Sequence, residues 1–129
     1  MNVKITVPVF LIAMLLISAC EDKGNPIVVV APTDTLTHFS QIQSLIATYN
    51  CASCHPGNGG FSVSSYSTIT GTGDHGAILI PGNGDGSNIV KKLRGTAAFG
   101  VRMPQGGPYL STTEIQKFVN WINQGALNN

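Results

Sequence analysis

The stretch Cys51-Ala52-Ser53-Cys54-His55 carries more structural information than any other part of this chain. Two cysteines three positions apart lie on one side of a helical turn. At this spacing their thiols can add to the two vinyl groups of one porphyrin, and the histidine that follows can reach the iron as proximal ligand. The motif therefore predicts one covalent haem c, bound by Cys51, Cys54 and His55.

Other interpretations of the cysteine pair are a local disulfide, a thioredoxin-like redox site and half of a zinc site. A thioredoxin-like site would need a βαβ surrounding, which the sequence does not indicate. A zinc site would need a second pair of ligands, but the third cysteine, Cys20, falls inside an export signal. The sequence context thus favours haem.

The export signal consists of a weakly positive start, Met1 to Lys4, and an apolar run from Ile5 to Ala19. The run is shorter than the roughly 20 residues that a transmembrane helix needs, and it is normal for a signal peptide. Its end, Leu16-Ile17-Ser18-Ala19-Cys20, resembles a bacterial lipoprotein signal. That resemblance implies that Cys20 is lipidated and becomes the first mature residue; ordinary cleavage and an uncleaved anchor are the alternatives.

The 129 residues leave room for one folded domain. We expect a signal peptide over 1–19, a proline-containing tether over 20–37 and the domain over 38–129. The chain has seven basic and six acidic residues, so without Lys4 the exported part has 7 − 1 = 6 basic and six acidic groups and no net charge. No basic surface is expected, which excludes nucleic acid as a partner.

The pattern of apolar residues and caps predicts a mostly α fold of three to four short helices. We expect a first helix over 39–49, capped by Ser40 with Gln43 and running into Cys51, and a helical turn over 65–70. A brief helix should follow Ser87 and end at Gly95, and the last should begin at Ser111 with Glu114 and end at Gly125. Trp121 should pack against the first helix. Long glycine-rich loops join these helices, and a cytochrome c-like fold around one covalent haem would explain them, because a porphyrin supplies the apolar face that a short chain lacks.

Met103 is the only methionine that follows the signal, and it lies 103 − 55 = 48 positions after His55. A thioether is a soft iron ligand, and Pro104 biases Met103 to an extended conformation. We therefore expect His55 and Met103 as axial ligands, with the second ring nitrogen of His55 donating to a backbone carbonyl. Met103 could instead fill a gap in the core, His38 or His75 could compete as ligands although both are expected to be solvated, and the sixth position could be open.

In addition, the chain resembles the planctomycete-type group of small class I cytochromes c over about Phe39 to Ala126. The resemblance implies a mostly α fold, covalent haem, and His55 and Met103 as axial ligands. It does not name an electron partner, and members often occur fused to other domains, which this chain does not show. The matching features, beside the haem motif and the helix before it, are Gly59-Gly60-Phe61, Ser65-Tyr66, Pro81-Gly82, Arg102-Met103-Pro104-Gln105-Gly106-Gly107, Leu110-Ser111, Glu114-Ile115 and Trp121-Ile122-Asn123-Gln124-Gly125-Ala126.

These features predict an electron carrier rather than an enzyme, since the loops offer no acid–base pair or nucleophile. We expect a lipid-anchored protein of the bacterial cell envelope that faces the periplasm and exchanges electrons with redox protein partners. The alternatives are a haem enzyme or gas sensor with an open or displaceable sixth ligand, and a binding module without haem. Arg102 and Tyr109 are candidates for hydrogen bonds to the haem propionates.

Overall fold

The computed structural model describes residues 36–129. The predicted signal, Cys20 and nearly all of the predicted tether lie outside this part of the chain. The described part is mostly helical, as predicted, but it holds five α-helices rather than three to four because two of them are single turns. The elements are α1 (Phe39–Thr48), α2 (Cys51–Cys54), the 3₁₀ turn η1 (Asn58–Gly60), α3 (Tyr66–Ile69), the antiparallel pair β1 (Thr72–Gly73) and β2 (Gly76–Ala77), α4 (Asn88–Arg94) and α5 (Thr112–Asn123).

Helix α5 begins and ends as its sequence predicts. The Ser111 side chain accepts a hydrogen bond from the backbone N–H of Glu114, and the Glu114 carboxylate accepts one from the backbone N–H of Ser111 at 2.8 Å. Gly125 has φ +98°, a left-handed conformation that suits glycine and ends the helix. Five side chains of the helix are buried: Ile115, Phe118, Val119, Trp121 and Ile122.

Helix α1 differs from the prediction at both ends. Its N-cap is His38 rather than Ser40, and the backbone N–H of His38 donates to the side-chain oxygen of Gln41 at 2.9 Å. The helix also stops at Thr48, because Asn50 adopts a left-handed conformation with φ +48°. The cysteine motif therefore sits in a helical turn of its own, α2, rather than at the end of α1.

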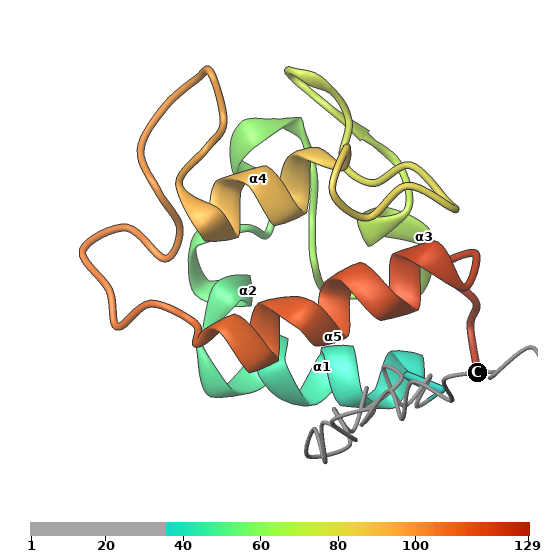
Figure 1. Ribbon diagram of the computed structural model, residues 1–129. Helices are drawn as coiled ribbons and strands as arrows, with labels where there is room; N and C mark the ends of the chain where they lie inside the picture. Colours follow the sequence, from blue (N-terminus) through green and yellow to red (C-terminus); the bar gives the residue numbers. More distant parts are fainter. Residues whose placement is uncertain (1–35) are drawn as a thin grey trace, which may run out of the picture. The chain divides into compact units, whose positions relative to one another are not determined.

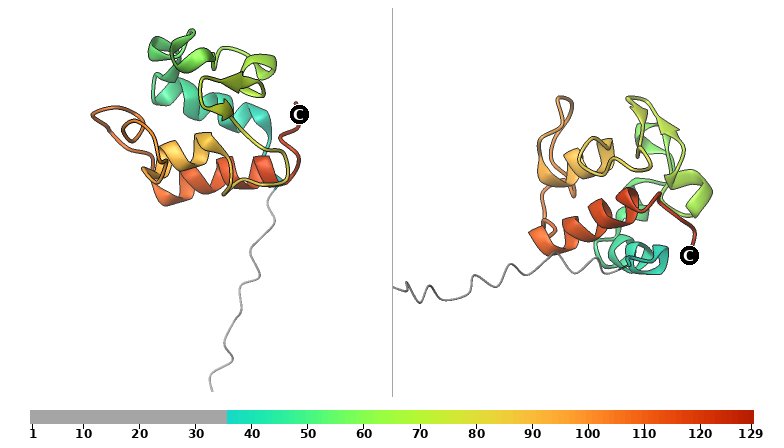
Figure 2. Two further views of the ribbon diagram at one scale, coloured as in Figure 1. Left: turned by 90° about the horizontal axis from the view of Figure 1, so that it is seen from above. Right: turned by 45° about the vertical axis from the view of Figure 1, so that its right-hand side comes forward.

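Helix α5 packs against α1 on one side and against α4 on the other. Figure 1 and the right-hand view of Figure 2 show this arrangement, with α5 between the other two helices. The Phe39 ring of α1 stacks on Trp121 with 5.4 Å between ring centroids, which confirms the predicted packing of this tryptophan. Tyr66 of α3 meets Phe39 edge-on, and its hydroxyl donates to the Ala126 carbonyl at 2.9 Å. These aromatic contacts close the core where the start of α1 meets the C-terminal residues, and the backbone N–H of Phe39 donates to the side-chain oxygen of Asn129 there.

Helix α4 follows Ser87 and ends at Gly95, which has φ +77°. The helix is confirmed, but the Ser87 side chain does not cap it. Its hydroxyl instead donates to the Asn83 carbonyl at 2.8 Å and accepts from the backbone N–H of Ile80 at 2.8 Å. Ser87 is fully buried and holds the preceding loop together.

The folded domain also includes a residue that the sequence assigns to the tether. Thr37 is buried, and its backbone N–H donates to the side-chain oxygen of Gln124 at 3.0 Å. Within residues 36–129, no helix has both the length and the apolar character required to cross a membrane.

Candidate functional site

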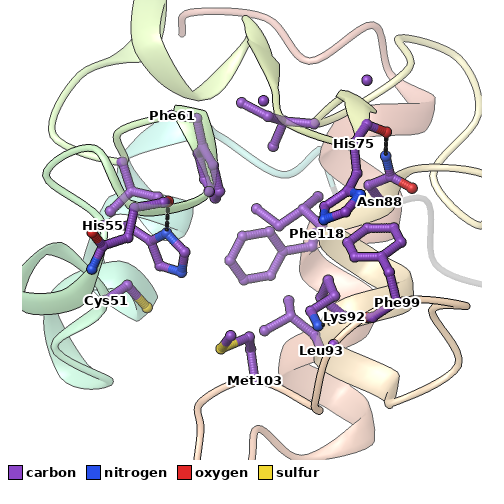
Figure 3. A pocket seen from close by; sticks show the side chains of 18 of the residues that line it. Cys51, His55, Phe61, His75, Asn88, Lys92, Leu93, Phe99, Met103 and Phe118 are labelled. Carbon is purple, nitrogen blue, oxygen red and sulfur yellow. Dashed lines mark hydrogen bonds between the residues drawn. The ribbon is translucent and has the colours of Figure 1, made fainter.

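The domain contains a cavity of about 310 Å³. This is the size of a small-molecule site, for which roughly 300–1,000 Å³ is typical. The cavity brings together Cys51, His55 and Met103, three of the four predicted haem-binding residues, from two distant parts of the chain (Figure 3). Much of the remaining lining is apolar and includes Ile46, Phe61, Val63, Leu93, Phe99 and Phe118.

The His55 ring is held in one orientation at the cavity wall. Its Nδ1 lies 2.7 Å from the backbone carbonyl of Asn58, which can only accept a hydrogen bond. Nδ1 is therefore the donor in this bond, and in the neutral imidazole this leaves the lone pair of Nε2 for a metal. The Phe61 ring packs against the imidazole with 4.6 Å between centroids. The sequence predicted that a backbone carbonyl would accept this bond, and the structure identifies it as that of Asn58.

Met103 is held by the C-terminal half of α4. Its backbone N–H donates to the Lys92 carbonyl at 3.0 Å, and Arg102 Nε donates to the Leu93 carbonyl at 2.9 Å. The Lys92 ammonium donates to the backbone carbonyls of Phe99, at 3.0 Å, and Val101, so it bridges the loop that leads to Met103. These bonds keep the Met103 side chain in the lining of the cavity that His55 also faces (Figure 3).

The two cysteines of the motif differ in their surroundings. Cys51 is half-buried in the cavity wall, and burial raises the pKa of its thiol. A thioredoxin-like cysteine has a lowered pKa, so this environment does not support such a site. Cys54 is exposed and is not part of the lining; its Sγ lies 3.7 Å from the Ser53 hydroxyl. Attachment of a haem through either cysteine therefore stays a prediction from the motif.

Both cysteines are free thiols, so the structure does not form the local disulfide. A zinc site has no support in the described part of the chain either, because residues 36–129 contain no cluster of three or more histidine, cysteine or acidic side chains placed to hold a metal.

His75, which the sequence offered as a competing ligand but favoured as solvated, lines the cavity and is exposed. Its ring stacks on Phe99 with 3.9 Å between centroids and 21° between planes. His38, the other histidine considered as a ligand, caps α1 and does not line the cavity.

Phe99, Lys92 and Asn88 line the cavity as well, and sequence reasoning did not assign them to the site. The one sequence feature that could have pointed to Phe99 is its closeness to Met103, which it precedes by 103 − 99 = 4 positions.

Arg102 and Tyr109, which the sequence offered as candidate propionate partners or as surface residues, lie elsewhere. The Arg102 guanidinium stacks over the Tyr109 ring at 4.1 Å from its centroid. Arg102 lines a separate hollow together with Arg94, and neither Arg102 nor Tyr109 belongs to the lining of the cavity. The structure therefore gives no support to these two residues as propionate ligands.

Comparisons with protein-family models, with curated proteins and with solved structures give no match to this chain. The likeness to planctomycete-type cytochromes c accordingly rests on the sequence motifs alone.

Proposed function

We propose that this protein is a monohaem c-type cytochrome that carries single electrons at the bacterial cell envelope. One observation supports the proposal above all others: His55 and Met103, which are far apart in the sequence, line the same apolar cavity beside Cys51. An imidazole and a thioether form the axial ligand pair of cytochromes c. The helical pattern of the sequence does not by itself require His55 and Met103 to line one cavity, so finding both there is independent support.

The residues present fit a porphyrin. The lining is predominantly apolar, as the faces of a macrocycle require. The hydrogen bond from Nδ1 to the Asn58 carbonyl leaves Nε2 of the neutral His55 imidazole as the nitrogen that can bind iron. The thiol of Cys51 stands in the same wall, one helical turn from Cys54. When bound, haem c supplies a one-electron iron centre.

The side chains of this protein orient and shield that centre. The Asn58 carbonyl fixes the tautomer and direction of His55, and Lys92 fixes the loop that carries Met103. Phe61, Leu93 and Phe118 exclude water from the cavity. A thioether favours reduced iron, so Met103 raises the reduction potential relative to harder ligands.

The place of action follows from the signal sequence. A lipoprotein-type signal ending at Cys20 supports a lipid-anchored protein of the cell envelope that faces the periplasm, where thioether attachment of haem takes place. The partners are redox proteins. With no net charge on the exported chain, their encounter with this protein depends weakly on electrostatic steering.

The substitution Met103→Ala tests the ligand assignment. The ferric wild-type protein should show the weak near-infrared band of an Fe–S(Met) bond, and Met103→Ala should lose it, because no sulfur remains in that part of the wall. His38→Ala is the matched control, since His38 lies outside the cavity, and it should keep the band.

Two results would contradict the proposal. Wild-type protein from a cytochrome-maturing host that shows no haem stain on a denaturing gel would exclude covalent haem. A haem-containing protein without the near-infrared band, unchanged by Met103→Ala, would instead favour the haem enzyme or gas sensor with an open sixth position.

A further inference from the structure

One end of the cavity carries polar and charged side chains, namely His75, Asn88 and Lys92. Figure 3 shows these three residues on the side opposite Cys51 and His55. Between the two ends the wall is formed by apolar side chains such as Phe118 and Leu93. We call the group of His75, Asn88 and Lys92 the polar end of the cavity.

His75 is held in place by its backbone and its ring face, which leaves its ring nitrogens available. The Asn88 side-chain amide donates to the His75 carbonyl at 3.0 Å and to the Ala77 carbonyl at 3.0 Å. The ring face stacks on Phe99. Among residues 36–129, no side chain or backbone group forms a hydrogen bond with either ring nitrogen. An imidazole always carries at least one N–H donor, so His75 brings an unused donor to the cavity.

Lys92 offers a second donor at the same end. Its ammonium has three N–H groups. Two of them are engaged by the carbonyls of Phe99 and Val101, and the ammonium lies 5.2 Å from the centroid of the Phe99 ring. One N–H and the positive charge therefore remain for an anion in the cavity.

The chemistry of a porphyrin matches this division. Its vinyl groups lie on one half of the ring and its two propionate carboxylates on the other half. Thioether bonds at Cys51 and Cys54 would turn the vinyl half toward α2 and the carboxylate half away from it. Carboxylates are costly to place against apolar side chains unless they are hydrogen-bonded or reach water. The polar end offers both, because His75 and Lys92 carry N–H donors and His75 is exposed to solvent.

We propose, on the basis of the proposed function, that the polar end is the propionate site, with His75 and Lys92 as hydrogen-bond donors to the haem carboxylates. This assignment replaces Arg102 and Tyr109, which lie outside the cavity. His75 lies in the two-residue turn between β1 and β2. The assignment gives it a role in positioning the cofactor rather than in ligating the iron.

The test uses haem-loaded protein and the substitution His75→Phe, which keeps an aromatic ring for stacking on Phe99 and removes the N–H donor. The propionate bending band in the resonance Raman spectrum should shift, and the reduction potential should fall because a carboxylate charge is less well neutralised. His75→Gln retains an N–H donor and should restore the band largely to its wild-type position. His38→Phe is the matched control, and both readouts should stay at their wild-type values.

Failure of this inference is distinct from failure of the proposed function. Protein that carries covalent haem and shows the Fe–S(Met) band, but whose propionate band and potential are unaffected by His75→Phe, would overturn the inference and leave the cytochrome proposal intact. If His75→Phe does not take up haem, proton NMR of the reduced wild-type protein decides the question. Contacts between the His75 ring protons and the propionate methylene protons would support the site, and their absence would overturn it.

Discussion

The Glu114 side chain links the N-cap of α5 to Tyr49, which lies at the C-terminal end of α1 just before the cysteine motif. Its carboxylate accepts hydrogen bonds from the Ser111 hydroxyl at 2.7 Å, the Ser111 backbone N–H at 2.8 Å and the Tyr49 hydroxyl at 2.8 Å. The bonds from Ser111, followed by the bond from Tyr49, lower the pKa of Glu114, while the bond to Glu114 raises the pKa of Tyr49. One side chain thus fixes the start of α5 and its contact with the end of α1.

The lowered pKa predicts a loss of stability in acid. The unfolded chain binds a proton at Glu114 more tightly than the folded chain does, so the contribution of this carboxylate is complete above about pH 4.5 and declines as the pH falls through the lower folded pKa. Glu114→Gln should therefore lower the thermal midpoint at pH 7 and make it less dependent on pH below about 4.5. Thermal unfolding followed by circular dichroism between pH 3 and pH 7 measures this; parallel curves for the two proteins would contradict it.

The loop between β2 and α4 is attached to α5 at Gly82 and Gly84, and at Gly84 the close approach leaves no room for a side chain. The backbone N–H of Gly82 donates to the Ile122 carbonyl at 2.8 Å, and that of Gly84 donates to the side-chain oxygen of Asn123 at 2.7 Å. A Cβ on Gly84 would lie 2.7 Å from the carbonyl oxygen of Val119 and 2.9 Å from its Cα. This close approach determines how the start of α4, and with it Asn88, is placed against the last helix.

Gly84→Ala should therefore destabilise the domain by about 1–3 kcal/mol, because the added methyl group meets backbone atoms that cannot move aside without shifting the loop. Gly71→Ala is the control, since its Cβ would meet the Thr68 carbonyl at 3.4 Å, an ordinary contact distance, and should change the free energy of unfolding much less. Denaturant unfolding measures both, and equal effects of the two substitutions would contradict the prediction.

The domain as a whole has one hydrophobic core, and four of its residues also line the cavity: Ile46, Val63, Leu93 and Phe118. Helices α1 and α5 share a well-packed contact at Phe39 and Trp121, while α2, α4 and the Met103 loop face the cavity with apolar side chains. Apolar surface of this kind favours burial against a partner. If that partner is haem c, the cofactor completes the core, and the stability of the domain depends on it.

The double substitution Cys51→Ala/Cys54→Ala tests this dependence. Without covalent haem, the cavity lining should be accessible, and the protein should bind a hydrophobic dye and unfold at a clearly lower temperature than the wild type. The two proteins are compared after expression in the same cytochrome-maturing host. Equal thermal midpoints and no dye binding would indicate that the cavity is not filled by an attached cofactor.

The elements that the sequence predicted best are those whose signals are local. Ser111 with Glu114 and the glycine at 125 mark both ends of α5, because a cap depends only on residues within one or two turns. The same reasoning misplaced the cap of α1, where Ser40 with Gln43 fits the pattern as well as the observed His38 with Gln41. It also extended α1 into the motif, although Asn50 is one of the few non-glycine residue types that readily adopts a left-handed conformation and can end a helix.

The amino-acid order alone therefore determined the helical class of the domain and the boundaries of its last two helices, because spacing and capping act over short distances along the chain. It also supplied the motif from which we predict a haem site. Only the tertiary structure decided that Met103 faces the cavity of His55, that His75 and Lys92 stand at its polar end and that Arg102 does not reach it. Those outcomes depend on how α4 and its loops dock on α5. Docking is decided by contacts between residues far apart in the sequence, such as Gly84 with Val119, and no local pattern encodes them.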